Sequence, residues 1–441
     1  MKKLLFVLLA FFVLQLSAQH TISGTFSPAE DYTWLIAYRL KPGSQVYVAD
    51  TAIKDGSFSL TMPENAETGT YRIVYAVPQE EFNFDVIYNG KENIVLDFNT
   101  DEGLTFTQSE ENIVLNTYLA ELAQIEAKII QFYTLQETDT TLFNVTTKNL
   151  KAHQNLFEIK SAGLLAQHFI TSNKPYISNN YESVQEYVAN KKAVYFDAID
   201  FNNPVLQSSG FLTDKVSNYA FTALPLTVQT KKETEDEIIK NVSHINVILN
   251  EVPAAFKFHL YNDLWNNAVA YDFNLVSDFV YTSNLKNLVE ATNNTDIKTA
   301  IEAHNRLRFG EIAPEMIWKD GINEKKISTL EPTENYILIF WSSTCGHCLN
   351  ELPALHKKLA NNTKVKIVAV GLEDESDNWN IEIKNLPNFE HIISLGKWDS
   401  EYADLYDIHA TPTYFILDSE KRIIAKPEDD KAVVEFLESK K

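Results

Sequence analysis

The sequence predicts three regions that fold differently: an N-terminal β-sandwich, an α-helical middle region and a C-terminal α/β domain. The chain has 441 residues, which is more than one ordinary domain holds. Its hydrophobic periodicity changes twice, from strand to helix and then to alternating strands and helices. Hydrophobic residues make up 45% of the chain, so each region can bury its own core. We expect a leader at 1–18 and domains at 19–108, 109–308 and 309–441.

The first 18 residues have the pattern of a secretory signal peptide. Two lysines precede an apolar run from Leu4 to Leu16, and small residues follow it up to Ala18. The run is shorter than the roughly 20 residues that a membrane-spanning helix needs. We therefore expect cleavage near Ala18 and export, most simply to a bacterial periplasm. A retained membrane anchor or a buried N-terminal strand is the alternative.

The region 19–108 has the pattern of a small β-sandwich. Short runs rich in β-branched and aromatic residues recur between turn residues. Asp55-Gly56 and Asn89-Gly90 are dipeptides favoured in hairpin turns, so we expect a hairpin at each. The predicted strands are Thr21–Phe26, Thr33–Leu40, Val46–Ile53, Ser57–Met62, Thr70–Ala76, Phe82–Ile87, Asn93–Asp97 and Leu104–Thr107.

The region 109–308 is predicted to be helical, because apolar residues recur at helical spacing from Val114 onward and prolines separate the later segments. It carries no recognisable catalytic constellation. His244 and His259 lack a cysteine or acidic cluster at ligand spacing, so we interpret them as ordinary histidines. The strongest helices after the first are Val184–Phe196, Phe211–Leu224, Glu233–Leu249, Phe256–Tyr271 and Asp296–Arg306.

The region 309–441 alternates strands and helices, which is typical of a mixed α/β sheet. Tyr336–Trp341 and Val365–Leu372 are almost wholly apolar, as buried strands are. Leucines at helical spacing predict a helix over Cys345–Ala360, between those two strands. A last helix is expected over Asp430–Glu438.

The net charge and the number of cysteines limit the classes of function that the chain can have. The chain has 38 basic and 60 acidic residues, a net charge of −22, so nucleic acid is not an expected partner. Its only two cysteines are Cys345 and Cys348. A disulfide between them would close a very small loop and would constrain the unfolded chain little. The pair therefore indicates chemistry rather than structural stabilisation.

The position of the pair suits thiol–disulfide exchange. Cys345 follows a strand at the expected start of a helix, where free N–H groups and the helix dipole stabilise a thiolate. Cys348 lies one turn later and can attack the mixed disulfide. Gly346 is expected to let the turn start without steric conflict. A protonated His347 imidazole beside the thiolate would favour the reduced form and make the pair more oxidising.

The segment W-S-S-T-C-G-H-C-L-N-E-L-P, residues 341–353, resembles the thioredoxin superfamily and, within it, the exported TlpA/ResA-like thiol-disulfide oxidoreductases. The family's helix reads C-x-x-C-x-x-E-x-P, which Cys345, Cys348, Glu351 and Pro353 match. The resemblance implies that Glu351 assists proton transfer; the alternative is a solvated helix residue. For this C-G-H-C pair we expect a potential between those of thioredoxin, about −270 mV, and protein disulfide isomerase, about −180 mV.

Two more segments carry the resemblance, which covers about 309–441 and implies a thioredoxin-like fold. The family's cis Thr-Pro bond, facing the cysteines, corresponds to Thr411-Pro412, and its exposed backbone would pair with an extended substrate. An ordinary trans proline at an edge strand is the alternative. The G-x-x-A-P lead-in is matched by Gly310–Pro314. Trp341, Thr411 and Pro412 are therefore assigned to substrate binding.

The sequence departs from the family's pattern at two positions. Thr344 stands where the family usually has Trp before the first cysteine, so a flat aromatic surface is missing. Ile339 stands where thioredoxins carry a buried acid, which leaves Glu351 as the main nearby carboxylate. The β-rich and helical regions also look like N-terminal regions attached to such oxidoreductases in some bacteria, a weaker likeness that implies nothing about mechanism.

Together these observations predict an exported thiol-disulfide oxidoreductase, acting as a reductase on protein substrates with thiols or disulfides. A membrane or periplasmic redox partner would reset the pair, and no cofactor or metal is expected. A disulfide isomerase, which usually needs a homodimer, stays open. So does a non-catalytic binding or assembly protein in which residues 20–308 do the work.

Two further alternatives are disfavoured. A thiol peroxidase would need a proline at the position of Leu338. A metal site built from Cys345, Cys348, His347 and His356 would lack the two separated ligand pairs usual for zinc.

Overall fold

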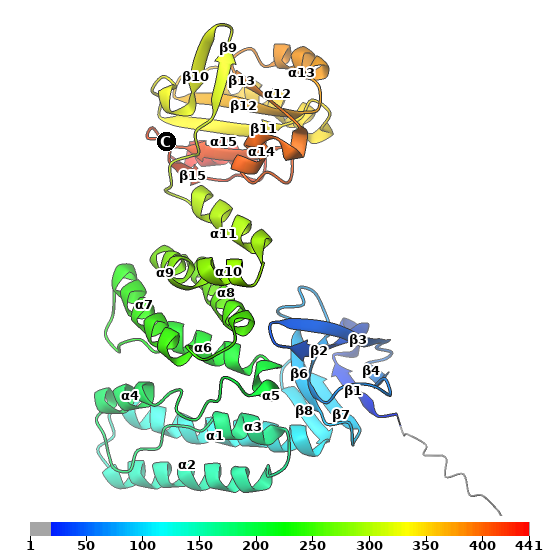
Figure 1. Cartoon of the computed structure of the whole chain (residues 1–441), viewed down its shortest axis with the longest axis vertical. Helices are drawn as coiled ribbons and strands as arrows, with labels where there is room; N and C mark the ends of the chain where they lie inside the picture. Colours follow the sequence, from blue (N-terminus) through cyan, green and yellow to red (C-terminus); the bar gives the residue numbers. More distant parts are fainter. Residues whose placement is uncertain (1–18, 441) are drawn as a thin grey trace, which may run out of the picture. The chain divides into compact units, whose positions relative to one another are not determined.

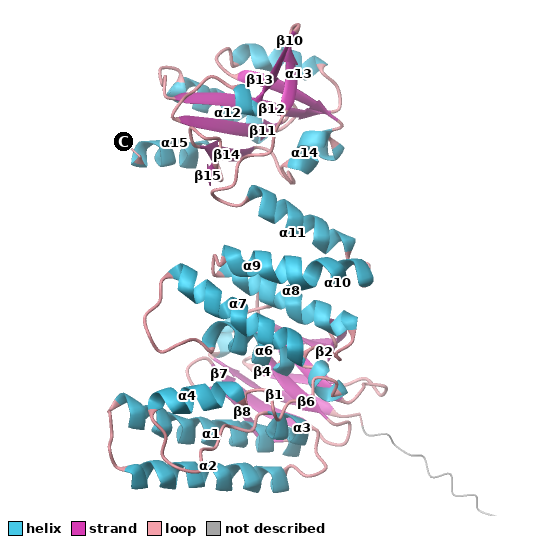
Figure 2. Ribbon diagram, turned by 60° about the vertical axis from the view of Figure 1, so that its left-hand side comes forward, coloured by secondary structure: helices cyan, strands magenta, loops and turns pink. Residues whose placement is uncertain are grey.

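The computed structural model describes residues 19–440, so the leader expected at 1–18 lies outside the described residues. The chain divides into two compact units that meet between Thr292 and Asn293. The described part of the first unit holds the β-rich region and ten α-helices; the second unit holds the α/β domain (Figures 1 and 2). The predicted three kinds of region are confirmed.

Within residues 19–108, eight strands form two four-stranded sheets, in the orders β4-β1-β7-β8 and β3-β2-β5-β6. Buried and exposed residues alternate along β4, where Phe58 and Leu60 point inward, and both sheets contribute to one core. This is the predicted β-sandwich. The strands are β1 (Thr21–Ser27), β2 (Trp34–Lys41), β3 (Ser44–Ala52), β4 (Ser57–Thr61), β5 (Gly69–Val74), β6 (Asn83–Tyr88), β7 (Ile94–Asn99) and β8 (Gly103–Gln108).

The two expected hairpin turns have a different role. Asp55 and Gly56 both have positive φ, and backbone hydrogen bonds of 2.9 Å join Lys54 and Ser57 across them, so a tight turn forms. However, β3 and β4 on either side belong to opposite sheets, and so do β6 and β7 beside Asn89-Gly90. These turns carry the chain from one layer to the other, which a local turn signal cannot distinguish from a hairpin.

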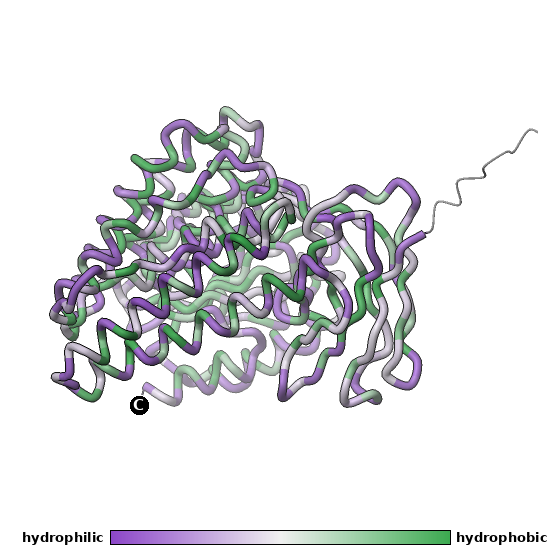
Figure 3. Tube along the Cα trace, turned by 90° about the horizontal axis from the view of Figure 1, so that it is seen from below, coloured by the Kyte–Doolittle hydropathy of each residue, from purple (hydrophilic) through white to green (hydrophobic). Residues whose placement is uncertain are grey.

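The helices of the middle region are amphipathic: along them hydrophobic and hydrophilic residues alternate every few positions (Figure 3). Between residues 19 and 440, no helix has the length and apolar character needed to cross a membrane. The helices are α1 (Glu110–Thr134), α2 (Thr140–Lys160), α3 (Ala166–Ser172), α4 (Val184–Ala193), α5 (Pro204–Gln207), α6 (Phe211–Thr222), α7 (Lys231–Ile248), α8 (Ala254–Ala270), α9 (Asn274–Val280), α10 (Lys286–Ala291) and α11 (Thr295–Leu307).

The sandwich and the helices of the first unit are joined by a buried amide. Asn112 in the first turn of α1 accepts from the Ile87 backbone N–H and donates to the Ile87 carbonyl, both at 2.8 Å. It thus satisfies backbone groups of β6 that the sheet leaves open. The last helix, α11, groups with the second unit, where Leu307 joins the core.

In the second unit, between residues 335 and 425, a five-stranded sheet has the order β13-β12-β11-β14-β15. The strands β11, β12 and β13 are parallel, and β14 and β15 are antiparallel to their neighbours. A hairpin of β9 and β10 precedes the sheet. The elements are β9 (Ile317–Asp320), β10 (Asn323–Lys326), β11 (Asn335–Trp341), α12 (Gly346–Leu359), β12 (Val365–Glu373), α13 (Asp377–Glu382), β13 (Glu390–Leu395), α14 (Glu401–Leu405), β14 (Thr413–Leu417), β15 (Ile423–Ala425) and α15 (Asp430–Ser439).

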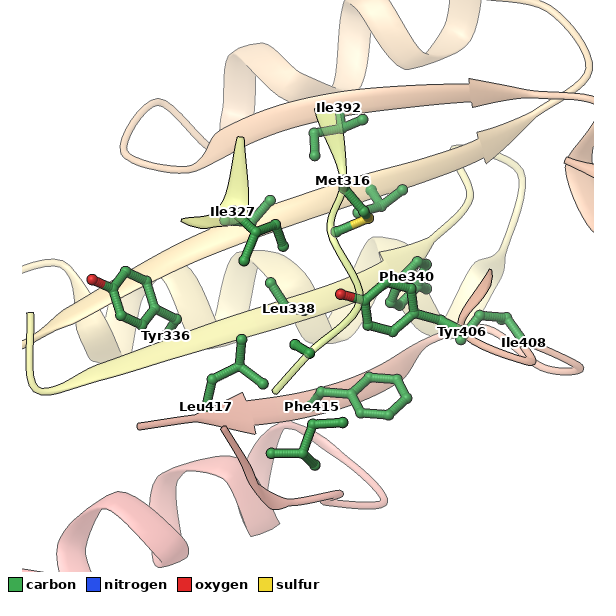
Figure 4. Packing of buried hydrophobic residues seen from close by; sticks show 14 of the residues in the cluster. Met316, Ile327, Tyr336, Leu338, Phe340, Ile392, Tyr406, Ile408, Phe415 and Leu417 are labelled. Carbon is green, nitrogen blue, oxygen red and sulfur yellow. The ribbon is translucent and has the colours of Figure 1, made fainter. Parts of the chain in front are cut away.

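Alternation along β11 divides the second unit's core in two. Tyr336, Leu338 and Phe340 face a cluster with Tyr406 and Phe415 (Figure 4). The residues between them face the other side, where α12 and α15 cover the sheet. Both faces are therefore buried, which explains why β11 is apolar throughout.

Candidate active site

The cysteine pair lies where β11 ends and α12 begins. Cys345 is the N-cap residue of α12, and its Sγ accepts a hydrogen bond of 3.2 Å from the Cys348 backbone N–H. The Cys345 N–H donates to the Ser342 carbonyl at 3.1 Å, which closes the turn between strand and helix. Both cysteines are free thiols. The sulfur thus takes the place that a serine or aspartate oxygen usually occupies at a helix N-terminus.

The surroundings of Cys345 favour its thiolate. Burial alone would raise the pKa of this half-buried thiol, but hydrogen bonds outweigh it and hold the pKa below the ordinary value. They come from the Cys348 side chain and backbone, from Thr411 and from the His347 backbone. Since the thiolate is the attacking species, Cys345 has the properties of a nucleophile.

Cys348 has the opposite environment. It is fully buried and belongs to the core between the sheet and α12. Burial, followed by its interaction with Cys345, raises the pKa of the Cys348 thiol to about 12. The two thiols therefore differ in access and in ionisation: one is poised to react with an external partner, and the other keeps its proton until Cys345 has reacted.

The segment before β14 completes the exposed side of the site. The Thr411–Pro412 peptide bond is cis, as the resemblance implied. The Cys345 thiol donates to the Thr411 carbonyl at 3.3 Å, so this backbone lies against the reactive sulfur. Thr411 and Pro412 are both half-buried. Their position follows from the pairing of β14 with β11, which sets Thr413 opposite Phe340, five residues before Cys345.

Glu351 lies one turn after Cys348 on α12 and is half-buried. Its Oε2 accepts a hydrogen bond of 2.9 Å from the hydroxyl of Tyr414, which is buried in β14. Glu351 is therefore tied to the core beneath the cysteines and is not a freely solvated helix residue. Sequence reasoning did not single out Tyr414, because a tyrosine in a largely apolar strand gives no sign that its hydroxyl contacts the site.

A second carboxylate near the site was also missed by sequence reasoning. Glu373, the last residue of β12, is 3% exposed. It accepts hydrogen bonds from the Ser343 backbone N–H and from the Ser343 hydroxyl at 2.9 Å, and its Oε2 lies 3.4 Å from the Ser342 hydroxyl. The Ser342 hydroxyl also accepts from the Thr344 N–H at 3.3 Å. Glu373 thus holds the loop that presents Cys345. The sequence feature that could have identified it is an acidic residue at the end of a buried strand.

Two residues differ from their expected roles. Trp341, assigned to substrate binding, is 1% exposed and packs in the core, so it supports the site from beneath. A Cβ at Gly346 would meet nothing within 4 Å, and its φ is not in the left-handed region, so sterics do not require glycine there. His347 is exposed in the first turn of α12.

The residues discussed for a metal do not assemble a site. Among residues 19–440, no group of three or more histidine, cysteine, aspartate or glutamate side chains is placed to hold a metal ion. His244 instead packs against Phe196 and Tyr219, and His259 lies 3.3 Å from the Thr213 hydroxyl.

Comparison with known proteins identifies one region of the chain. Residues 334–423 match the family model of thioredoxin-like proteins. No curated protein matches the chain. A domain of a possible thiol-disulfide isomerase from Cytophaga hutchinsonii is 27% identical, over 30% of this chain and 93% of that one, with a TM-score of 0.27.

Two other solved structures are similar to parts of the chain. The thioredoxin domain of a thiol-disulfide oxidoreductase from Bacteroides vulgatus is 22% identical, over 30% of this chain and 97% of that one (TM-score 0.27). A thioredoxin-like protein from Bacteroides caccae is 16% identical, over 60% of this chain and 98% of that one (TM-score 0.36). With the family match at 334–423 and the observed sheet, the C-terminal region of this chain is a thioredoxin-like domain of the thioredoxin superfamily.

Proposed function

We propose that the protein is an exported thiol-disulfide oxidoreductase that reduces protein disulfides through its C-G-H-C pair. The observation that carries this proposal is the asymmetry of the two thiols. Cys345 is accessible, with a lowered pKa, at the start of α12, and Cys348 lies buried next to it with a pKa of about 12. Access and a lowered pKa suit the thiol that attacks the substrate, and a buried position next to it suits the thiol that resolves the mixed disulfide.

The reaction has two steps. The Cys345 thiolate attacks one sulfur of a substrate disulfide, the substrate S–S bond breaks, and the second substrate sulfur leaves with the electron pair. Cys348 then attacks Cys345, the intramolecular disulfide forms, and the first substrate sulfur is released as a thiol. The substrate is reduced, the pair is oxidised, and two electrons from a membrane or periplasmic redox partner reset it.

The surroundings of Cys345 support further roles in this proposal. The backbone at Thr411 and Pro412, against the sulfur, is the place where an extended substrate would pair. His347, exposed in the first turn of α12, would favour the reduced pair when protonated. Thr344, also exposed, leaves the rim of the site without the aromatic usual in the TlpA/ResA-like family.

The reduction potential of the Cys345–Cys348 couple tests the proposal. The protein is equilibrated in glutathione buffers, and its free thiols are then labelled and counted. A value below about −230 mV supports a reductase, and a value of about −150 to −190 mV favours an oxidase or isomerase instead. The absence of a reversible two-electron titration contradicts any thiol-disulfide exchange. In that case the alternative of a binding or assembly protein predicts that Cys345→Ala, Cys348→Ala keeps full function in cells.

The isomerase alternative has a separate test. An isomerase of this superfamily usually works as a homodimer with a cleft. Size-exclusion chromatography with light scattering measures the mass of the exported chain directly. A monomer at all concentrations counts against the isomerase, and a stable dimer with a potential near about −180 mV supports it.

A further inference from the structure

The loop that follows β13 lies at the same edge of the sheet as the reactive cysteine. The strands β11, β12 and β13 are parallel neighbours, and the register sets Glu373, the last residue of β12, opposite Leu395, the last residue of β13. Cys345 follows the end of β11, and the segment 396–400 follows the end of β13. Parallel strands end at one edge, which is where open α/β sheets bind their ligands.

Hydrogen bonds connect this loop to the turn that carries Cys345. The Gly396 N–H donates to the Glu373 carbonyl at 3.0 Å. The Glu373 carboxylate in turn holds the backbone and hydroxyl of Ser343, two residues before Cys345. Neighbouring strands are about 4.8 Å apart, so the ends of β11 and β13 are separated by roughly 10 Å. An extended chain rises about 3.3 Å per residue, so about three residues of a substrate span that distance.

Two large apolar side chains at the end of β13 and in this loop are exposed. Leu395 is 58% exposed and Trp398 is 43% exposed. Single exposed apolar residues are common on protein surfaces, but these two lie three positions apart at the edge that carries the reactive sulfur. Thr344, the residue before Cys345, offers no aromatic surface there. Trp398 is therefore an aromatic side chain that a polypeptide bound at Cys345 can reach from the opposite side of β12.

The loops at this edge are acidic. The segments 374–377 and 396–401 carry one lysine, Lys397, whose ammonium lies 3.8 Å from the Asp374 carboxylate. They also carry five exposed carboxylates, which belong to Asp374, Glu375, Asp377, Asp399 and Glu401. A surface with this excess of negative charge attracts lysine and arginine side chains of a partner and repels acidic ones.

We propose that Leu395 and Trp398 form a substrate subsite for polypeptides that carry an aromatic or large apolar residue together with a basic residue about three or four positions from the reacting cysteine. This inference rests on the proposed function and names the substrate class of the same site. The substrate passes Cys345 beside the Thr411 backbone and continues over the end of β12. Its aromatic residue packs on Trp398, and its basic residue meets the acidic loops.

Mixed disulfides of synthetic peptides with thionitrobenzoate test the subsite. Each peptide has one cysteine, and the residues about three and four positions away on both sides are phenylalanine with lysine, serine with lysine, or phenylalanine with glutamate. The Cys345 thiolate of the reduced full chain attacks the peptide sulfur, and thionitrobenzoate leaves with the electron pair of the broken bond. Its absorbance in a stopped-flow instrument gives the rate of attack. Dithiobis-nitrobenzoate, which carries no peptide, is measured in the same way.

The variants separate the aromatic contact from the charge. Trp398→Ala removes the aromatic ring, and Trp398→Phe retains one. The double variant Glu375→Gln, Asp399→Asn removes two of the carboxylates. Phe309→Ala is the matched control, because Phe309 is also an exposed aromatic of this domain, and the residue after it donates its N–H to β15, the opposite edge strand of the sheet, at 2.8 Å.

The expected effects depend on the peptide. The wild type attacks the phenylalanine–lysine peptide about fivefold faster than the serine–lysine peptide, which corresponds to one aromatic contact. Trp398→Ala loses this preference, whereas Trp398→Phe and Phe309→Ala keep it. The preference for lysine over glutamate decreases in the double variant and with added salt. Every variant reacts with dithiobis-nitrobenzoate within about twofold of the wild type, which also reports an intact site.

Other outcomes overturn the inference. Equal rates of the wild type with all three peptides, or an unchanged preference for phenylalanine in Trp398→Ala, remove the subsite. A dimer that light scattering detects in the wild type and not in Trp398→Ala, together with unchanged peptide rates, assigns the surface to self-association instead. A wild type that keeps the peptide attached and forms no Cys345–Cys348 disulfide, as mass spectrometry would show, contradicts the proposed function and this inference together. The two kinds of failure are thereby distinguished.

Discussion

At the scale of single residues, the two cysteines acquire their chemistry from each other and from neighbours that are distant in the sequence. Cys345 depends on Thr411, and Cys348 on the core formed by the sheet and α12. Their spacing alone identifies a pair, but the direction of each pKa shift follows from burial and hydrogen bonds. The same holds for Glu351, whose partner Tyr414 comes from another strand.

The lowered pKa of Cys345 predicts selective alkylation of the reduced protein. A depressed pKa means a larger thiolate fraction at neutral pH than a free cysteine has, whose pKa is about 8.5. Iodoacetamide should therefore modify Cys345 with a midpoint below that value and leave Cys348 unmodified, as peptide mass spectrometry would show. In denaturant both should react alike; a native midpoint at or above the ordinary value would contradict the geometry.

Glu373 predicts a stability effect at the active-site loop. Replacing it with alanine leaves the buried Ser343 N–H and hydroxyl without their acceptor. We expect Glu373→Ala to lower the free energy of unfolding by about 1–3 kcal/mol. Glu375→Ala, which removes an exposed carboxylate two residues away, should change it by no more than about 0.5 kcal/mol. Equal urea midpoints for the two variants would refute this role.

At the scale of elements, two glycines show that the need for glycine at a position depends on which element packs against it. A Cβ at Gly371 in β12 would lie 2.4 Å from the Trp379 indole, because α13 packs directly on this strand. At Gly346 in the catalytic turn the space is open. The sequence suggested a steric role for Gly346 and none for Gly371, since the neighbour of Gly371 comes from a different element.

The two glycines give a matched pair of substitutions. Gly371→Ala must displace the Trp379 ring and should lower the free energy of unfolding by about 1–3 kcal/mol. Gly346→Ala should be neutral or slightly stabilising, because alanine favours the helix by up to about 1 kcal/mol. Thermal unfolding of the reduced proteins measures both. A Gly371→Ala variant as stable as the wild type would contradict this prediction and would show that α13 and its Trp379 ring can shift at little cost in free energy.

At the scale of the whole molecule, the chain consists of two units, and the cysteine pair lies in the second. The sandwich and ten helices form one unit through contacts such as that of Asn112 with Ile87, and the cysteine pair lies in the other. The partners of the cysteine pair and its loop, such as Thr411 and Glu373, belong to the second unit, so we expect the chemistry of the pair to persist when the first unit is perturbed.

Asn112→Ala tests this division. It leaves the Ile87 N–H and carbonyl without partners and should destabilise the first unit by about 1–3 kcal/mol. Hydrogen exchange resolved by peptide would locate the loss within residues 19–292. The reduction potential of the cysteine pair should stay unchanged in Asn112→Ala. Asn116→Ala is the control, because the Asn116 amide makes only a long, exposed hydrogen bond of 3.4 Å to the Leu104 carbonyl; its stability and its reduction potential should both equal those of the wild type. A shifted potential in Asn112→Ala would mean that the units are coupled.

The sequence by itself determined the order of the three regions, because the hydrophobic period is local: it places the eight strands of the sandwich, most of the long helices and the strand–helix junction at Cys345. It also determined the cysteine pair, since no other cysteine exists. The tertiary structure decided that the Asp55-Gly56 turn joins two sheets, that Trp341 is buried, and that Glu373 and Tyr414 serve the site. Each of these depends on contacts between residues distant in the sequence, formed when strands pair and layers pack, and a local pattern does not specify those contacts.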